Sequence, residues 1–448
     1  MTEKIAYYSD WLYLPHGVLN GASIKAALSF AVRSRGKVVG AIRAYKEDED
    51  YLYVPREFYT PQQLGQVGIA IERQIPKFEQ AQFQDRIVLR DEVQEEAFAK
   101  MVKAGGGVLC LLCGGGKTVL ALKYAAHLGV PALVVVHTED LLRQWKGAVT
   151  NFLGMEPGTI QGPLEKWTWD RPIVMAMIQT LAERASDIPR AIRRKFGLVI
   201  HDECHHVSAP FFSKTAHLFS GTRLGLTATP EREDGLHPLF LAHLGRVFFT
   251  YLHQPLTPEL FFVDVKTGLS WPKLAYASCD ANGDFNFSKM WQVLARDRLF
   301  LDRCLALIGR CIREGRKTLI LCRTHAALYA LAEETEKLAP GQVGIVTGKE
   351  RGKNREEAIT KKNLIFGVAQ LAKEGLDRPD LDTLILLEPI KARGVLQQTL
   401  GRISRDVPKQ APRVYVMRTP YPPIYAMCNA MRKPLREWGI PFSIVKGE

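Results

Sequence analysis

The sequence predicts an α/β protein of two tandem lobes, each built on a parallel sheet, with a small α+β domain before them. Its 448 residues exceed what one ordinary hydrophobic core accommodates, so two or three domains are expected. Short apolar runs alternate with helix-like segments in two stretches, as in parallel sheets covered by helices. A looser segment rich in proline, glycine and polar residues, 257–287, separates the stretches. The expected domains are therefore residues 1–82, 83–255 and 256–448.

Composition indicates a globular protein with a polyanionic partner. Hydrophobic residues make up 46% of the chain, and no apolar run reaches the roughly 18 residues of a membrane span. With no apolar signal-peptide core either, a soluble cytoplasmic protein is expected. The 60 lysines and arginines outnumber the 47 acidic residues by 13. After residue 300 there are 26 basic and 16 acidic residues, against 34 and 31 before it, so the excess is concentrated late in the chain.

The first 82 residues alternate short apolar and aromatic runs with glycine, proline and an acidic turn at 47–50. This pattern predicts hairpins and one helix, Gly21–Arg33. The aromatic side chains Tyr7, Tyr8 and Trp11 fit a DNA-recognition module and fit equally a structural cap on the first lobe.

The strands expected in the two lobes are apolar runs of four to eight residues, a length typical of buried strands. In the first lobe they lie at 108–112, 131–136, 171–177, 196–203 and 222–229. In the second they lie at 317–322, 341–348, 363–369, 382–389 and 413–417.

The run 108–112 is followed by a glycine turn and a helix-period segment, a layout that suits a phosphate. Glycines let backbone N–H groups approach an anion, and a helix N-terminus adds unpaired donors and partial positive charge. Leu111 stands where the general pattern has its first glycine. We expect Lys117 to contact the β and γ phosphates and Thr118 to ligate Mg²⁺. The candidate loop residues are Gly114, Gly115, Gly116, Lys117 and Thr118, and the alternative is a plain glycine turn.

A second strand, Leu198–Ile200, ends at the acidic pair Asp202 and Glu203. We expect Asp202 to hold the metal through its water shell and Glu203 to act as general base. The crowding of His201, Cys204, His205 and His206 leaves a zinc site as an alternative. The eight cysteines show no secreted-type framework, and Cys110 and Cys113 fit core packing, so reduced thiols are expected.

Taken together, these segments resemble a superfamily 2 helicase, and they run in that superfamily's order from about residue 87 to 418. The resemblance implies two RecA-like lobes that use ATP and Mg²⁺. Residues 112–118 ("LCGGGKT") resemble motif I in its helicase form, which does not need the first glycine. The segment 89–97 resembles the adenine-reading region, with Arg90 and Gln94 as candidate nucleotide contacts. The remaining resemblances are 134–145 to motif Ia, 202–205 ("DECH") to motif II, 226–230 to motif III, 367–382 to motif V and 396–405 to motif VI.

In motif VI, Arg402 and Arg405 are three residues apart, so on a helix they would share one face. The resemblance implies that both act as arginine fingers on the γ-phosphate, with Gln398 one turn away. Motif V would place Gly375 and Asp377 near the ribose and the contacts between lobes. The alternative for motif VI is an ordinary amphipathic basic helix.

The triplet Arg232, Glu233 and Asp234 after motif III resembles the XPB branch of the superfamily, whose members act on duplex DNA. The tract 370–389 followed by 396–405 is also similar to XPB-type and phage-type DNA helicases. Cys204 in "DECH" fits a DEAH-like spelling. The long thumb-like insertion of that branch is not evident, and at most residues 271–298 form a short version.

The resemblance implies an ATP-dependent DNA helicase or translocase for duplex, forked or branched DNA in replication, recombination or repair. We expect it to act as a monomer in a bacterial or phage-infected cell, alongside replication or repair proteins. Two alternatives stay open: an RNA-directed motor, and a non-catalytic binding protein whose vestigial site is stabilised by zinc, against which Lys117 and Glu203 argue. Candidate nucleic-acid contacts are Thr138, Gln179, Thr180, Arg232, Lys349 and Gln370.

Overall fold

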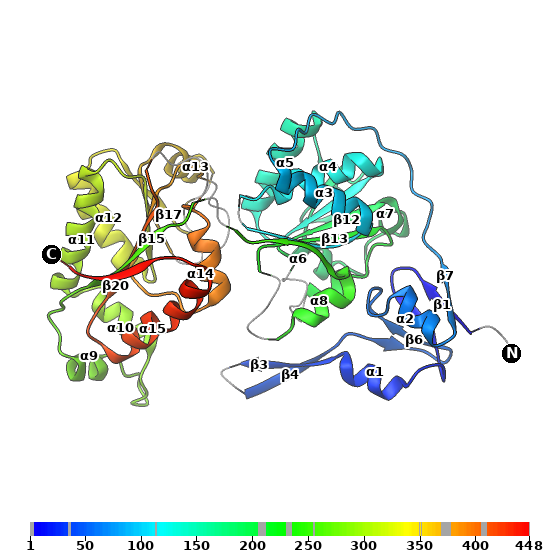
Figure 1. Cartoon of the computed structure of the whole chain (residues 1–448), viewed down its shortest axis with the longest axis horizontal. Helices are drawn as coiled ribbons and strands as arrows, with labels where there is room; N and C mark the ends of the chain where they lie inside the picture. The colour runs from blue at the N-terminus through cyan, green and yellow to red at the C-terminus, as the bar shows by residue number, and fades with distance from the viewer. Residues whose placement is uncertain are drawn as a thin grey trace. The chain divides into compact units, whose positions relative to one another are not determined.

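The computed structural model contains two compact units, Met1–Leu252 and His253–Glu448 (Figure 1). It describes residues 4–34, 37–112, 114–204, 212–229, 235–253, 256–348, 350, 352–368, 378–404 and 410–447. None of the helices in these ranges is long and apolar enough to cross a membrane.

The main sheet of the first unit has seven strands in the order β10-β11-β9-β12-β13-β8-β14. Every neighbouring pair is parallel. This confirms the parallel α/β class, while β10 and β14 were not among the expected strands. The strands are β8 (Gly107–Leu111), β9 (Ala132–Val136), β10 (Gly158–Ile160), β11 (Ile173–Met177), β12 (Leu198–Asp202), β13 (Thr222–Thr227) and β14 (Val247–Tyr251).

Apolar residues on both faces of this sheet are buried by helices. Along β9, Val134 belongs to one hydrophobic cluster, whereas Leu133 and Val135 belong to another. The first cluster includes residues of α3, α4 and α5, and the second includes residues of α6 and α7. Burial on both faces explains why these strands read as continuous apolar runs. The helices are α3 (Glu92–Ala104), α4 (Lys117–Leu128), α5 (Glu139–Leu153), α6 (Ile178–Glu183), α7 (Arg190–Lys195) and α8 (His237–Leu244).

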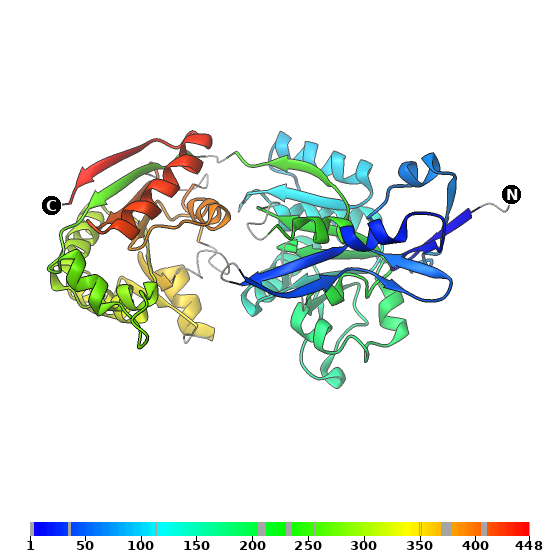
Figure 2. The same ribbon diagram turned by 90° about the horizontal axis from the view of Figure 1, so that it is seen from below.

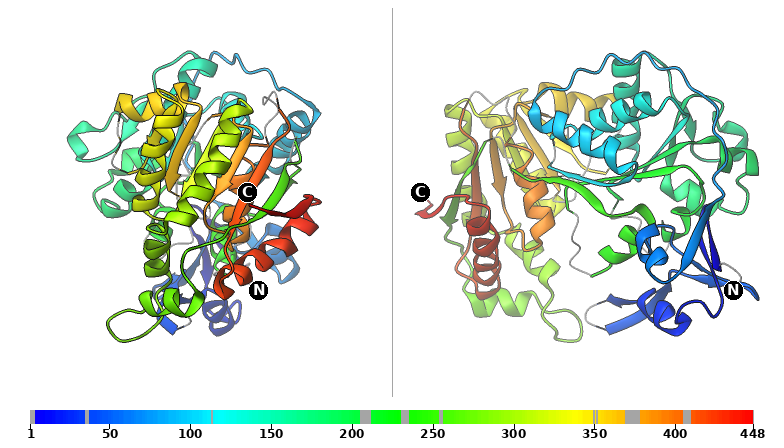
Figure 3. Two further views of the ribbon diagram at one scale, coloured as in Figure 1. Left: turned by 90° about the vertical axis from the view of Figure 1, so that its left-hand side faces the viewer. Right: turned by 45° about the vertical axis from the view of Figure 1, so that its right-hand side comes forward.

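The second unit is built on another seven-stranded parallel sheet, in the order β17-β18-β16-β19-β20-β15-β21. The two sheets confirm the prediction of tandem RecA-like lobes. Helices flank this second sheet in Figure 3. The strands are β15 (Glu259–Asp264), β16 (Thr318–Cys322), β17 (Val343–Val346), β18 (Leu364–Val368), β19 (Thr383–Leu386), β20 (Arg413–Arg418) and β21 (Phe442–Lys446). The helices are α9 (Trp271–Ala277), α10 (Phe287–Leu294), α11 (Arg298–Arg313), α12 (His325–Leu338), α13 (Gly352–Lys361), α14 (Arg393–Leu400) and α15 (Pro422–Glu437).

The looser segment 257–287, which was expected to separate the two stretches, also contributes a strand to the second sheet. Strand β15 lies within that segment and pairs with β20 on one side and β21 on the other. Leu260 and Phe262 of β15 are completely buried in the core of the second unit. The apolar run is short and its neighbours are rich in proline and glycine, so the local signal was that of a loop.

The N-terminal region forms a five-stranded sheet in the order β5-β6-β2-β1-β7, within the first unit. It confirms the small α+β region, but the helix expected at Gly21–Arg33 ends at Ala27. Residues after it form β3, which pairs with β4 in an antiparallel ribbon (Figure 2). The elements are β1 (Lys4–Tyr8), β2 (Leu12–Pro15), α1 (Gly21–Ala27), β3 (Ser29–Ser34), β4 (Lys37–Arg43), β5 (Lys46–Glu47), β6 (Tyr51–Val54), α2 (Pro61–Gln66) and β7 (Ile69–Arg73).

Two buried arginines join the N-terminal region to the parallel sheet by reaching in opposite directions. Arg56 donates to the backbone oxygens of Ser220 and Gly221, both at 2.9 Å. Arg223, on β13, donates to the backbone oxygens of Asp10 at 2.7 Å and His243 at 3.0 Å. Each arginine is only 2% exposed, and burial lowers the pKa of Arg223 to about 9.

Two histidines, the half-buried His217 and the buried His243, lie in the same junction. The ring of Trp11, from the N-terminal region, lies with its centre 4.7 Å from that of His217 and 5.8 Å from that of His243. Burial, and then the nearby cations Lys46, Arg223 and Arg193, lower the pKa of His217 to about 3. The pKa of His243 is also lowered, by burial first and then by Arg223, His217, His201 and Arg56. Both histidines are therefore neutral in the folded chain near neutral pH.

Replacing Arg56 by alanine is expected to destabilise the first unit by about 2–4 kcal/mol, because buried carbonyl groups lose their donors. Urea denaturation would measure the loss. Limited proteolysis should cut the extended segment 74–86 faster in this variant, since the N-terminal region is released. Arg43→Ala, at an exposed arginine, is the matched control. Equal stability of Arg56→Ala and the unchanged protein would contradict the anchoring role.

Stability should also fall as the pH drops from about 7 to about 5.5. The unfolded chain protonates its histidines below a pKa of about 6.5, whereas folded His217 and His243 stay neutral, so acid favours unfolding. Each of these two histidines is expected to lower the free energy of unfolding by up to about 1.4 kcal/mol for every pH unit below that pKa. Urea denaturation at both pH values would measure the loss. His217→Phe keeps an aromatic ring beside Trp11 and should lose its share of the pH dependence; an unchanged slope in this variant would contradict the assignment.

Candidate nucleotide site

Three segments singled out in the sequence meet at one edge of the first sheet. Strands β12, β13 and β8 are neighbours and run parallel, so their carboxyl ends lie side by side. β8 leads into the glycine loop, β12 ends at Asp202 and β13 ends at Thr227. Ligands of parallel α/β sheets bind outside this edge.

The glycine loop adopts backbone conformations that other residues rarely adopt. Gly114 has φ of 81° and Gly116, which caps α4, has φ of 87°. A Cβ on Gly116 would lie 2.3 Å from Nε2 of Gln94, and one on Gly115 would lie 3.1 Å from the Leu112 oxygen. The loop therefore depends on glycine both for its backbone angles and for close packing.

Lys117, the first residue of α4, turns its side chain back over the loop. Its ammonium donates to the backbone oxygens of Leu111 at 2.9 Å and Leu112 at 3.4 Å. Thr118 follows in the first turn of the helix, where backbone N–H groups and the helix dipole favour an anion. The loop, the ammonium and the helix N-terminus are thus gathered at the end of β8.

Gln94 lies directly against this loop. Its side chain is 4% exposed; Oε1 accepts from the Arg90 N–H at 2.9 Å, and Nε2 donates to the Gly115 oxygen at 3.4 Å. The Arg90 side chain is exposed and pairs with Asp91, which caps α3. Burial opposes ionisation of Asp91, but hydrogen bonds from Gln94 and Arg90 outweigh it and lower the pKa of this carboxyl. The sequence predicts Gln94 as a base contact, and in the structure Gln94 contacts the glycine loop.

The acidic pair at the end of β12 is held in a defined orientation. Asp202 accepts from the indole Nε1 of Trp145 at 2.8 Å and from the Glu203 N–H at 3.0 Å. Glu203 is buried and has φ of 47°, and no other non-glycine residue in the described ranges has a positive φ. Such backbone strain is typical of functional positions. Trp145 was missed as a site residue, although a buried indole N–H requires an acceptor and could have signalled it.

The zinc alternative gains no support from the residues described. Cys204 is buried in an apolar cluster, and burial raises the pKa of its thiol well above the usual range. A Cβ on Gly225 would lie 3.0 Å from the Cys204 sulfur, which shows that the cysteine packs on the β13 backbone. No three His, Cys, Asp or Glu side chains in the described part of the chain could share a metal. His205 and His206 lie outside it.

The nucleic-acid contacts expected in the first unit take part in internal hydrogen bonds. Thr138 caps α5 by accepting from the Leu141 N–H at 3.3 Å. Gln179 donates to the His137 oxygen at 2.8 Å, and Thr180 accepts from the Gly162 N–H at 3.4 Å. Arg232, Lys349 and Gln370 lie outside the described residues.

In the second unit, the shared helix face of Arg402 and Arg405 stays a prediction, because Arg405 lies outside the described residues, and Arg402 itself follows the helix. Helix α14 ends at Leu400, and the Arg402 N–H bonds to the oxygen of Thr399, three residues back. The chain has therefore changed to a tighter turn, in which the α-helical spacing no longer applies. Gln398 is buried within α14, and Arg402 is buried just after it. Arg405, Gly375 and Asp377 lie outside the described ranges.

Comparisons with known proteins agree with this architecture. The family described as "Type III restriction enzyme, res subunit" matches residues 86–232. "DNA 3'-5' translocase XPB2" of Sulfurisphaera tokodaii is 28% identical over 371 residues, which are 73% of this chain and 81% of that protein. "Probable helicase D10" of Escherichia phage T5 is 27% identical over 66% of the chain and 63% of its own length. "Putative ATP-dependent RNA helicase L396" of Acanthamoeba polyphaga mimivirus is 28% identical over 70% of the chain and 60% of its own length.

Two parallel sheets, a glycine loop and an acidic pair on a nearby strand are the arrangement expected of a helicase-type ATPase of superfamily 2. With the similarities to the XPB2 protein and the phage helicase, they support an XPB-like superfamily 2 helicase. The resemblance seen in the order of the sequence motifs is thereby confirmed.

Gly116→Ala is expected to lower ATP hydrolysis at least about 10-fold and to cost about 1–3 kcal/mol of stability. The added methyl group would require a strained positive φ and would displace the buried Gln94 amide. Gly147→Ala is the matched control, because Gly147 lies inside α5 with open space around it. It should keep full activity and gain about 0.5–1 kcal/mol. Equal activity of both variants would show that the loop does not depend on glycine at this position.

Proposed function

We propose that this protein uses ATP hydrolysis to move along or unwind duplex, forked or branched DNA in replication, recombination or repair. The observation that carries the proposal is the glycine loop at the end of β8 with the oriented acidic pair at the end of β12. Such a pair beside a phosphate loop suits phosphoryl transfer to water, which depends on positioning and electrostatics.

For the nucleotide, we propose that Gly114, Gly115, Gly116 and Lys117 bind the phosphates and that Arg90 and Gln94 lie near the base. Lys117 now donates to two loop carbonyls, so phosphate oxygens would have to draw its ammonium away from them. Gln94 donates to the Gly115 oxygen of the glycine loop. We therefore propose that Gln94 couples binding of the nucleotide base to the position of the loop that binds the phosphates.

The residues present fit Mg²⁺, because Thr118 and Asp202 offer hard oxygen ligands. Mg²⁺ bound with ATP would neutralise phosphate charge during hydrolysis. Trp145 and the Glu203 N–H each occupy one direction of one Asp202 oxygen, so the carboxylate keeps lone pairs for water ligands. Glu203 follows at the strand end, where we propose that it takes a proton from the attacking water.

From the second unit, we propose that Gln398, Arg402 and Arg405 stabilise charge on the γ-phosphate, and that Gly375 and Asp377 contribute near the ribose. These roles rest on the motif order, with Arg402 placed directly after α14. Arginine suits such a role because its charge is permanent and its donors are arranged as a fork.

We propose that DNA is held mainly through its phosphates, by Thr138, Gln179, Thr180, Arg232, Lys349 and Gln370 among others. The basic excess after residue 300 supports binding that is independent of sequence and weakened by salt. The XPB2 relative is named as a 3'-5' translocase, and we propose the same direction here. We propose three domains, residues 1–82, 83–255 and 256–448. We also propose that the protein acts as a monomer in the cytoplasm, together with replication or repair proteins.

An RNA-directed motor is a second candidate. One relative of similar identity is named as a putative ATP-dependent RNA helicase, so the substrate must be compared directly.

Steady-state ATPase rates with no nucleic acid, single-stranded DNA, duplex DNA, a four-way junction and RNA should be highest with duplex or branched DNA. Glu203→Gln should lower the stimulated rate about 10²–10⁴-fold, because the general base is lost while nucleotide binding remains. Lys117→Ala should weaken nucleotide binding as well. Stimulation by RNA alone would replace the DNA assignment, and activity that survives in both variants would contradict the site.

A further inference from the structure

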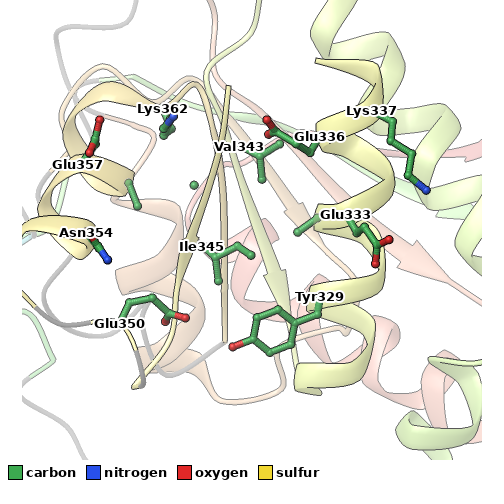
Figure 4. Close-up of a pocket in the computed structure, with 13 residues that line it drawn as sticks. Tyr329, Glu333, Glu336, Lys337, Val343, Ile345, Glu350, Asn354, Glu357 and Lys362 are labelled. Atoms are coloured by element: carbon green, nitrogen blue, oxygen red, sulfur yellow. The ribbon is translucent and has the colours of Figure 1, made fainter. Parts of the chain in front are cut away.

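A groove on the second unit lies beside strand β17, between helices α12 and α13 (Figure 4). It has a cavity volume of about 800 Å³. Strand β17 is the last strand at its edge of the sheet and pairs only with β18 among the described strands. The groove therefore borders an open sheet edge, which is a place where another extended chain can pair.

The hydrogen bonds around β17 indicate which backbone groups face outward. The Gln342 oxygen accepts from the Leu364 N–H of β18 at 3.1 Å, so Gln342 faces the sheet. Because backbone direction alternates along a strand, Gly344 and Val346 also face β18, and Val343 and Ile345 face outward. The Thr347 N–H, next on the outward side, is bonded at 2.6 Å to the Glu350 carboxylate. Two residues of β17 thus offer backbone donors and acceptors to an added strand.

The two helices enclose this edge from opposite faces. A Cβ on Gly344 would lie 2.7 Å from the Ala358 oxygen, so α13 packs closely against that face. Val343 and Ile345 point to the other face, toward the side of Tyr329 and Glu333 on α12. The apolar lining consists of Tyr329, Ala332, Val343, Ile345 and Ala358. Apolar side chains of an added strand could pack against these residues.

The groove carries negative charge on a basic protein. Its lining includes four carboxylates and two ammonium groups, a formal charge of −2, whereas the whole chain carries +13. Both ammonium groups have partners: Lys337 pairs with Glu334, and Lys362 donates to the Gly341 oxygen. The four carboxylates are Glu333, Glu336, Glu350 and Glu357.

One of these carboxylates closes the end of the groove. Burial opposes ionisation of Glu350, but hydrogen bonds from Thr347, and one from Tyr329, outweigh it and lower the pKa of this carboxyl. Glu350 is therefore charged and held in place. Glu336 accepts from the Gly341 N–H at 2.6 Å, which orients it at the groove. Glu333 and Glu357 remain on the open side of the groove; Glu357 also pairs with the exposed Lys361 at 3.6 Å, a partner that an incoming cation would have to replace.

We propose that this groove binds an extended, basic segment of a partner protein, which pairs with the outer edge of β17 as an additional strand. Main-chain bonds to Val343 and Ile345 supply affinity, and lysine or arginine side chains meet Glu333 and Glu357. The negative charge of the described lining favours a basic segment over a nucleic-acid backbone. A partner held here would accompany the motor without occupying its nucleotide site.

The proposal is tested with the full chain and a synthetic, fluorescent peptide of about eight residues that alternates lysine and valine. Anisotropy should show saturable binding, and the same peptide with N-methylated amides should bind at least about 10-fold more weakly, because it cannot form the ladder. Hydrogen exchange should slow at the amides of Val343 and Ile345 when the peptide is added. Equal binding of the N-methylated peptide, or no binding, would overturn the proposal.

The double variant Glu333→Gln with Glu357→Gln should bind the peptide about 10-fold more weakly, with ATPase activity unchanged. Glu165→Gln, at an exposed glutamate of the first unit, is the matched control and should bind normally. Unchanged affinity in the double variant would overturn the proposed site. Protection of Val343 and Ile345 by duplex DNA in place of the peptide would do the same.

Discussion

Strand β13 is the constraint on which the organisation of the first unit depends. Arg223, Gly225 and Thr227 alternate along it, so their side positions share one face. Arg223 anchors the N-terminal region, Gly225 accommodates Cys204 of the acidic segment, and Thr227 lies at the carboxyl end beside β8. A rigid strand paired on both sides thus joins the N-terminal region to the edge where the nucleotide is proposed to bind.

Packing on β13 also explains why a glycine, Gly225, faces the side chain of Cys204. A side chain at position 225 would collide with the Cys204 sulfur, so a bulkier residue at either place would force the acidic pair away from β13. Asp202 is held from the opposite side by Trp145 of α5. The orientation of the carboxylates is therefore decided by packing around them as much as by their own sequence.

Local patterns predicted the parts of the fold that local physics decides. The apolar runs gave most strands of both sheets, and the residues Gly114 to Thr118 gave the loop and the start of α4. Contacts between distant residues leave no periodic signal: the pairing of Arg56 with Ser220 could not be predicted, and the indole of Trp145 signalled the need for an acceptor without identifying Asp202. β15 was missed because only its partners β20 and β21, far along the chain, make it a strand. The end of α14 was missed although its C-cap is Gly401, a residue type that commonly marks the end of a helix.

The anchoring of Arg56 also has a consequence for synthesis of the chain. Its acceptors, the oxygens of Ser220 and Gly221, lie 164 and 165 residues further along. At about 5–20 residues per second, a ribosome adds that length in roughly 10–30 s. During this interval the N-terminal sheet is already outside the ribosome while the surface meant to cover Arg56 and Trp11 has not yet been made. Chaperones that cover exposed aromatic surface therefore have a defined window in which to act on this protein.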